Sequence, residues 1–254
     1  MVRTEFHAQL AALRADVLEL GGLALSGLER VIGALQENDH AVAAAIVAED
    51  AALNRRHAAI QKDAIKTLAR QQPAAGDLRA ITAAMMIASE LERIGDYSTG
   101  TAKLILREPN EPALPPSHDL YRMARAARRM LLRSLDAYAT QDAALARRIW
   151  NEDPTVDSFQ QTLYRDLLTS MIENPSTLTR ATQLLWVVHN LERVADRATN
   201  ICEQTLFMVE GEWSSAESLR DASLVPEGLP LDMIDLPSPL GGGIAPPMPR
   251  ERGT

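Results

Sequence analysis

The sequence LERIGD at residues 91–96 returns as LERVAD at residues 191–196, and each copy lies in a long stretch whose apolar residues recur at helical spacing. In each copy a Glu is followed four residues later by an Asp. At 3.6 residues per turn, these two carboxylates stand one above the other on one face of a helix. Like charges at this spacing repel by about 0.2–0.5 kcal/mol. A chain that carries this repulsion twice, at matched places, is expected to offset it with a bound cation.

The carboxylates form a stripe of their own beside the apolar face of the predicted helix. With Leu191 at the centre of the apolar face and about 100° per residue, Glu192, Asp196 and Glu203 lie about 100–140° away, beside Asn200. The first copy repeats this arrangement. The stripe therefore lies at the edge of the buried face, where a neighbouring helix can reach it.

The composition favours long helices and excludes several classes of protein. Charged residues make up 24% and aromatic residues 4% of the chain, and good helix formers dominate all but its last part. The net charge of -8 and the pI of about 5.2 argue against a general nucleic-acid binder and against direct attraction to an anionic membrane. Cys202 is the only cysteine, so the sequence holds no intrachain disulfide or thiolate zinc site. It falls on the apolar stripe and is expected to be a small buried hydrophobe.

The location of the protein is also constrained by what the sequence lacks. The first residues do not show the basic and then apolar pattern of a secretory signal. No apolar run reaches the length of a membrane span. We therefore expect a soluble cytoplasmic protein.

The helical pattern restarts half-way along the chain. Three helices are predicted before a proline-dense stretch, with Asn38-Asp39 as the cap of the second and Pro73 at the start of the third. Three more follow it, with Gln141-Asp142 and Asn174-Pro175 in the corresponding places. We predict an all-α fold, a six-helix assembly of two tandem three-helix bundles with a disordered C-terminal tail. The predicted parts are a first repeat (1–107), a proline-rich linker (108–117), a second repeat (118–212) and a Pro/Gly-rich tail (213–254).

The middle helices of the two halves correspond residue by residue. The stretch from Asp39 to Asp50 aligns without gaps with the stretch from Asp142 to Asp153. Pro154 has no counterpart in the first half, and we expect it to kink the middle helix or restart it with Asp153 as the cap. If the middle and third helices of each half pack antiparallel, their polar rows face each other.

Each half then offers oxygen ligands from two helices. Such hard ligands suit magnesium, manganese, calcium or iron, and bridging carboxylates support more than one ion. His189 adds a nitrogen but has no counterpart in the first half. The candidate ligands are Asp50, Asn54, Glu92 and Asp96 in the first half, and Asp153, Asp157, Glu192 and Asp196 in the second, which Asn200 and Glu203 could join.

The alternative is a solvated helical face without a metal, its carboxylates paired with arginines. Arg93 and Arg193 point about 100° beyond the preceding Glu, so we expect them to pair with another helix or a partner protein instead. The first site is the weaker one, because Lys103 brings a positive charge, Asn54 is neutral and Gly100 has no ligand.

Motifs for catalysis are missing from the sequence. It has no phosphate-binding glycine loop and no nucleophile elbow. A di-iron oxidase needs two Glu-x-x-His pairs, and the one such pair here, Glu37 to His40, falls at a predicted helix junction. We therefore expect a protein that is not an enzyme. A carboxylate-bridged hydrolase or oxidase is the alternative, followed by a metal-free helical scaffold.

With these motifs, the chain resembles the PhoU family of phosphate-transport accessory proteins. Residues 73–79, PAAGDLR, are similar to the Pro-x-Ala-x-Asp-Leu-Arg element of that family, and residues 196–201, DRATNI, to its second-repeat signature. The resemblance covers roughly residues 5–212. The chain departs from the family at Gly100 and Lys103, at 178–180 where the Asp-Leu-Arg counterpart is lost, and in its long tail.

The resemblance implies a regulator that restrains phosphate uptake and the phosphate-starvation response. Its implied partners are the ATPase subunit of the phosphate ABC transporter and a membrane sensor histidine kinase, so that the protein reaches the membrane only through its partners. It also implies a homodimer and a multinuclear metal cluster on the carboxylate stripes, with iron as the first choice and magnesium, manganese or zinc as alternatives. We expect Arg79, Arg93 and Arg193 to be the residues that contact partners.

Overall fold

The structure, a computed structural model, describes residues 2–71, 73–107 and 116–212. Most of the predicted linker and the predicted disordered tail lie outside these residues. All the regular structure described is helical, which confirms the all-α prediction. No helix in these three ranges has the length and apolarity of a membrane span. The elements are α1 (Val2–Glu37), α2 (His40–Gln71), α3 (Ala75–Arg107), α4 (His118–Thr140), α5 (Ala143–Trp150), α6 (Asp153–Glu173), the 3₁₀ turn η1 (Pro175–Thr177) and α7 (Leu178–Glu210).

The turns that follow α1 and α4 show the duplication directly. Asn38 and Gln141 both adopt the left-handed conformation, with φ of 54° and 56°. The next residue caps the following helix in each repeat. Asp39 accepts hydrogen bonds from the backbone N–H groups of Ala41 and Val42, while Asp142 accepts one from Leu145. Both predicted caps are confirmed, because a carboxylate at this position satisfies amides that a helix leaves unpaired.

The predicted break at Pro154 is present, but its cap is not Asp153. The N-cap of α6 is Glu152, which makes no side-chain capping hydrogen bond, and Asp153 is the first residue of α6. Pro154 is tolerated in the first turn because its missing N–H would have no partner there. Glu152 is instead paired with Arg133 of α4. The Asp153 carboxylate is therefore not used for capping. The break also means that α5 and α6 together correspond to one helix of the predicted six.

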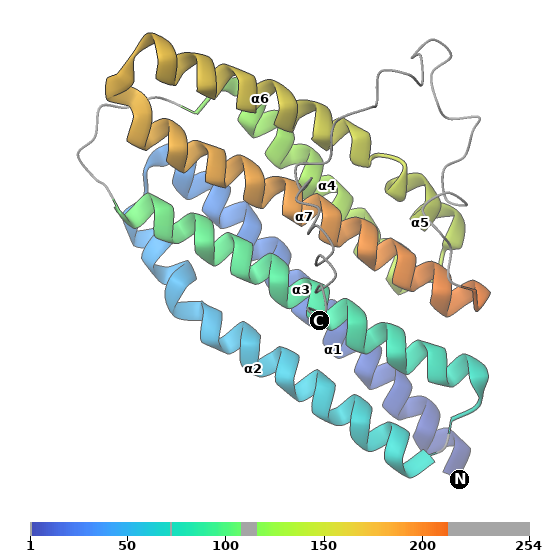
Figure 1. The fold of residues 1–254 in the computed structure, drawn as a ribbon. Helices are drawn as coiled ribbons and strands as arrows, with labels where there is room; N and C mark the ends of the chain where they lie inside the picture. Colours follow the sequence, from blue (N-terminus) through green and yellow to red (C-terminus); the bar gives the residue numbers. More distant parts are fainter. Residues whose placement is uncertain (1, 72, 108–115, 213–254) are drawn as a thin grey trace, which may run out of the picture. The chain divides into compact units, whose positions relative to one another are not determined.

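Helices α3 and α7 run antiparallel and side by side at the centre of residues 1–220, as Figure 1 shows in green and orange. Contacts between distant residues confirm this direction: Asn190 of α7 donates a hydrogen bond to Thr101 of α3, whereas Asn200, further along α7, donates one to Glu90, which precedes Thr101 in α3. Helix α2 packs on α3 and helix α6 on α7. Helices α3 and α7 hold matched places in the two repeats and run in opposite directions. An approximate two-fold rotation therefore relates the repeats.

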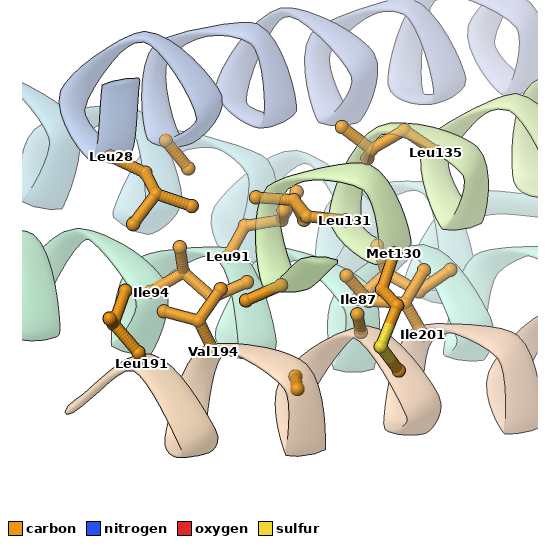
Figure 2. Packing of buried hydrophobic residues seen from close by; sticks show 14 of the residues in the cluster. Leu28, Ile87, Leu91, Ile94, Met130, Leu131, Leu135, Leu191, Val194 and Ile201 are labelled. Carbon is orange, nitrogen blue, oxygen red and sulfur yellow. The ribbon is translucent and has the colours of Figure 1, made fainter. Parts of the chain in front are cut away.

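The core is built mainly from α1, α3, α4 and α7. Figure 2 shows side chains of these four helices packed together, among them Leu91 and Leu191 from the two motif copies, which are 0% and 4% exposed. Cys202 is fully buried, as predicted, and its burial raises the pKa of the thiol. The Gly21-Gly22 pair does not interrupt α1. Gly21 is a point of close packing, because a Cβ there would lie 2.6 Å from Cδ2 of Leu135 in α4.

Candidate metal centre

Four carboxylates face one another between α6 and α7. Asp153 and Asp157 lie one turn apart on α6, and Glu192 and Asp196 lie one turn apart on α7. All four are half-buried. Burial, followed by the charges of Asp157, Asp196 and Glu192, raises the pKa of Asp153 to about 7. We call these four residues the second-repeat cluster. The sequence predicted their juxtaposition from helical spacing together with antiparallel packing of the middle and third helices.

Burial and neighbouring charge also act on Asp157 and Glu192. Burial raises the pKa of Asp157, and the charge of Asp196 adds to it. Burial also raises the pKa of Glu192, again with Asp196 as the largest electrostatic contribution. One oxygen of Glu192, Oε2, is buried and makes no hydrogen bond within the described residues. The cluster therefore holds more negative charge than its surroundings compensate, which is the condition that favours a cation.

Arg193 lies between two of these carboxylates, contrary to the prediction that it turns away to another helix or a partner. Its Nε is 3.1 Å from Oε2 of Glu192, although the angle is too poor for a hydrogen bond, and its Nη1 donates a 2.9 Å hydrogen bond to Oδ2 of Asp196. The prediction considered only the direction of the Cα–Cβ bond. A long arginine stem folds back along its own helix, so the guanidinium reaches the acid three residues ahead.

The residues of the second-repeat cluster fit a cation in their chemistry. They supply only hard oxygen donors, and Oε2 of Glu192 is left without a hydrogen bond in the part of the chain that the structure describes. As the side chains stand, however, no three carboxylate, imidazole or thiol groups of the described residues converge closely enough to hold an ion. The guanidinium of Arg193 takes the place of a cation beside Glu192 and Asp196. Arg193 would therefore compete with a metal ion for these two carboxylates.

The two additional ligands considered for the second half point elsewhere. Asn200 donates a 3.1 Å hydrogen bond to Glu90 of α3, and Glu203 accepts a 3.1 Å hydrogen bond from the indole of Trp150. The four residues from Asp196 to Asn200 turn the helix by about 40° beyond a full circle, which directs Asn200 towards α3. Glu203 keeps nearly the direction of Asp196 but lies about two turns further along α7, beside Trp150 of α5. His189 packs edge-on against Trp186, and its pKa is lowered by burial first and by Arg193 next. It lies at the margin of the cluster, and its lowered pKa favours the neutral imidazole.

The first repeat holds a smaller and more open group of carboxylates, Asp50, Glu92 and Asp96, which we call the first-repeat cluster. Asp50 lies on α2 and the other two on α3. Burial raises the pKa of Glu92, followed by the charge of Asp96; burial and then Asp50 raise the pKa of Asp96, which Lys103 opposes. Asp96 is exposed. This cluster is therefore less crowded with charge than its counterpart, in keeping with the weaker first site that the sequence indicates.

Neutral donors surround Asp50. Its Oδ1 accepts a 2.9 Å hydrogen bond from the hydroxyl of Thr99, and its Oδ2 accepts a 3.2 Å hydrogen bond from the amide of Asn54. The carbonyl oxygen of Asn54 is buried and has no hydrogen-bond partner among the described residues. Asn54 therefore orients Asp50 and keeps one oxygen free for a ligand.

The sequence reasoning missed a polar link between the two repeats. Arg197 of α7 lies 3.2 Å from Oε2 of Glu90 in α3, and each side chain is 18% exposed. Asn200 donates to the same oxygen. The matched positions in the other repeat are Tyr97 and Asn190, which differ from Arg197 and Glu90, so a comparison of the repeats could not reveal this link.

The PhoU domain family matches residues 17–105 and 120–205, once in each repeat. The chain belongs to the PhoU family. It is 38% identical over 209 residues to the phosphate-specific transport system accessory protein PhoU homolog of Caulobacter vibrioides (strain NA1000 / CB15N), which covers 82% of this chain and 90% of that one. The homolog of Rhizobium meliloti (strain 1021) is 34% identical over 222 residues. This alignment covers 87% of this chain and 93% of the homolog.

Two crystal structures of PhoU proteins have the same fold. The phosphate transport system regulatory protein PhoU from Streptococcus pneumoniae superposes with a TM-score of 0.77 at 30% identity, covering 83% of this chain and 99% of that one. PhoU from Pseudomonas aeruginosa superposes with a TM-score of 0.77 at 32% identity. The superposition covers 82% of this chain and 100% of that one. The resemblance inferred from the paired motifs is thereby confirmed over both repeats.

The three arginines predicted to contact partners have different surroundings in this PhoU-family chain. Arg93 is exposed on α3. Arg79 belongs to α3, and its side chain extends to the end of α7. Its guanidinium carbon would lie 3.1 Å from a Cβ placed on Gly211. Arg193 is occupied within the second-repeat cluster. Of the three, Arg93 is therefore the residue best placed to meet another protein.

Proposed function

We propose that this chain is an accessory protein of phosphate transport that acts as a cytoplasmic metal-binding adaptor. In this role it restrains phosphate uptake and the phosphate-starvation response when phosphate is plentiful. The observation that carries the proposal is the match, over most of both chains, to relatives named phosphate-specific transport system accessory proteins. The match covers both repeats, including both copies of the carboxylate motif.

The second-repeat cluster is the part of the molecule that the proposal assigns to metal. Asp153, Asp157, Glu192 and Asp196 would hold the ion, with iron as the first choice and magnesium, manganese or zinc as alternatives. A bound cation would neutralise the four carboxylates and tie α6 to α7. The same carboxylates form a half-buried surface that changes its charge when the ion binds, and such a change is what an adaptor needs to alter its affinity for a partner.

We propose two partners, the ATPase subunit of the phosphate ABC transporter and a phosphate-sensing histidine kinase. The proposed active form of this chain is a homodimer. The proposed role is regulatory and does not require turnover. Arg93, exposed on α3 next to the first-repeat cluster, is the candidate contact residue. The alternative of a carboxylate-bridged hydrolase predicts multiple turnovers of a phosphoester by metal-loaded protein, and that observation would remove the adaptor proposal.

The deciding experiment measures alkaline phosphatase output in abundant phosphate, in a bacterium whose own homologue is deleted. Complementation with the wild type is expected to return a high output to a low one. Glu192→Ala/Asp196→Ala is expected to fail, whereas Glu92→Ala/Asp96→Ala, its counterpart in the first repeat, retains at least part of the repression. If wild type does not lower the output, the regulatory role is wrong. If both double variants repress like wild type, the metal part of the proposal is wrong.

A second measurement addresses the metal directly. The metal content of protein purified without oxygen is determined by elemental analysis, for wild type and for Glu192→Ala/Asp196→Ala. We expect at least one ion per chain in the wild type and a clear loss in the variant. Wild-type protein that is folded, active in repression and free of metal would support a plain helical scaffold instead.

A further inference from the structure

A cavity of about 260 Å³ lies between α1, α2 and α3 in the first repeat. The side chains of Leu23, Ile46 and Leu53 line it, together with the backbone at Gly27. A Cβ placed on Gly27 would have its nearest neighbour, in Ser98, at 3.9 Å, so that a side chain at this position would have room. Because an apolar cavity of about 150 Å³ holds benzene, this one is large enough for a ring with a short substituent.

In the second repeat, a buried methionine stands at the position of Gly27. Asn38 and Gln141 are matched residues. Gly27 lies 11 residues before Asn38, and Met130 lies 11 residues before Gln141, so Gly27 corresponds to Met130. Met130 is 1% exposed, and Figure 2 shows its side chain directed from α4 towards Ile201 of α7. The two copies of one architecture therefore differ at this point: one has a glycine beside the cavity and the other a buried methionine.

Two ion pairs confirm that these positions correspond. Arg30 of α1 binds Glu49 of α2 at the rim of the cavity, and in the second repeat Arg133 of α4 binds Glu152 in the same way. The surrounding apolar residues follow the same correspondence. Leu23 is 44% exposed at the cavity, whereas its counterpart Ala126 is only 7% exposed. The two rims are thus alike, and the interiors differ.

The charge at the rim of the cavity is negative. Asp50, which belongs to the lining, accepts hydrogen bonds from the neutral groups of Thr99 and Asn54. The cation of the rim, Arg30, is held by both oxygens of Glu49 at 2.6 and 3.2 Å. The guanidinium is therefore already neutralised, while the charge of Asp50 has no paired cation among the described residues. An apolar interior beside such a carboxylate favours a ligand with an apolar body and one positive group.

We propose that this cavity is a binding site for a small organic amine. Its apolar body lies against Leu23, Ile46 and Leu53 and over Gly27, and its ammonium group donates hydrogen bonds to Asp50. A carboxylate ligand of the same shape is rejected by the charge of Asp50. The site lies in the first repeat, apart from the second-repeat cluster, and the proposal depends neither on a bound metal nor on the role in phosphate transport.

The test uses the full chain in EDTA, so that no metal ion competes for Asp50, and titrates it with 2-phenylethylamine, phenylacetate and 2-phenylethanol by two-dimensional NMR. The amine is expected to saturate one site at millimolar concentration and to bind at least tenfold more tightly than phenylacetate. Gly27→Met, which copies the second repeat, is expected to weaken the amine at least tenfold. Gly22→Met is the matched control, because Gly22 of the same helix faces open space, and it is expected to bind within twofold of wild type.

Asp50→Asn separates the two halves of the proposed site. It is expected to weaken the amine at least fivefold and to leave 2-phenylethanol within twofold, because the apolar walls are intact. It also decides the matter if Gly27→Met does not fold. The proposal is overturned if the amine does not saturate, if phenylacetate binds as tightly as the amine, if Gly27→Met binds like wild type, or if Asp50→Asn weakens amine and alcohol equally.

Discussion

Nη1 of Arg193 donates a 2.9 Å hydrogen bond to Oδ2 of Asp196, so that an arginine from the repeated motif itself neutralises part of the second-repeat cluster. The same guanidinium contacts Glu192 through Nε. Its matched residue in the first repeat, Arg93, is exposed. The two copies of one motif therefore use the same arginine differently, and the difference can be measured.

Replacement of Arg193 by methionine is expected to strengthen metal binding. Arg193 competes with an ion for Glu192 and Asp196, and a half-exposed charge pair of this kind contributes about 1 kcal/mol, or roughly a fivefold change in affinity. Calorimetric titration with Mn²⁺ at pH 7.5 checks this. Arg93→Met, the matched variant, is expected to change the Kd less than twofold. Equal or weaker Mn²⁺ binding by Arg193→Met would show that Arg193 does not compete.

Asp153 makes the metal-free protein less stable as the pH rises. Its pKa is raised to about 7 in the folded state by burial and by neighbouring carboxylates, against about 4 in an unfolded chain. The folded state therefore holds the proton more tightly, and between these values each step up in pH favours unfolding. In EDTA we expect the contribution of Asp153 to lower the Tm between pH 4 and pH 7. Above pH 7 this contribution no longer changes.

Asp153→Asn tests this dependence, because asparagine resembles the protonated acid. In EDTA, its Tm is expected to equal that of wild type near pH 4 and to exceed it by about 3 °C or more at pH 8, as about 1 kcal/mol corresponds to 2–4 °C in a chain of this size. Asp136→Asn, at an exposed position of α4, is the control and is expected to follow wild type at both pH values. A Tm for Asp153→Asn below that of wild type at pH 8 would contradict the effect.

The two neighbouring glycines of α1 should respond differently to alanine. Gly22→Ala is expected to stabilise the fold by about 0.5–1 kcal/mol, because alanine favours the helix and no described atom lies within 4 Å of its Cβ. Gly21→Ala places a Cβ 2.6 Å from Leu135, which must shift. We expect its free energy of unfolding, measured in urea, to be about 1–3 kcal/mol lower than that of Gly22→Ala. Equal stability of the two variants would mean that Leu135 moves without cost.

The link between Glu90 and Arg197 is expected to contribute more than an exposed ion pair. A double-mutant cycle with Glu90→Gln and Arg197→Met, measured by urea unfolding, should give a coupling energy of about 1–3 kcal/mol, because both side chains are largely buried between α3 and α7. The cycle for the exposed pair Arg30 and Glu49 is the comparison and should give less than about 1 kcal/mol. A coupling energy no larger than in that pair would show that the link does not stabilise the joint between the repeats.

Much of the architecture follows from local patterns in the chain. Helical spacing predicted the helices, the residues Asp39 and Asp142 predicted their caps, and Pro154 predicted the break between α5 and α6. The stripe that holds Glu192 and Asp196 could be predicted because 3.6 residues per turn fixes the relative direction of side chains on one helix. The gap-free alignment of the middle helices matched Asp153 with Asp50, and antiparallel packing of the middle and third helices placed Asp153 across from that stripe.

Other features depend on contacts between segments that are far apart in the chain. The antiparallel packing of α3 on α7 brings Asn200 and Arg197 to Glu90, and no local period determines which helix a given face will meet. The position of Arg193 depends on a flexible stem that finds the nearest compensating charge. The cavity beside Gly27 depends on how far three helices stand apart. Periodicity along one helix thus specifies which residues share a face, whereas packing between helices specifies which charges are neutralised and where space is left open.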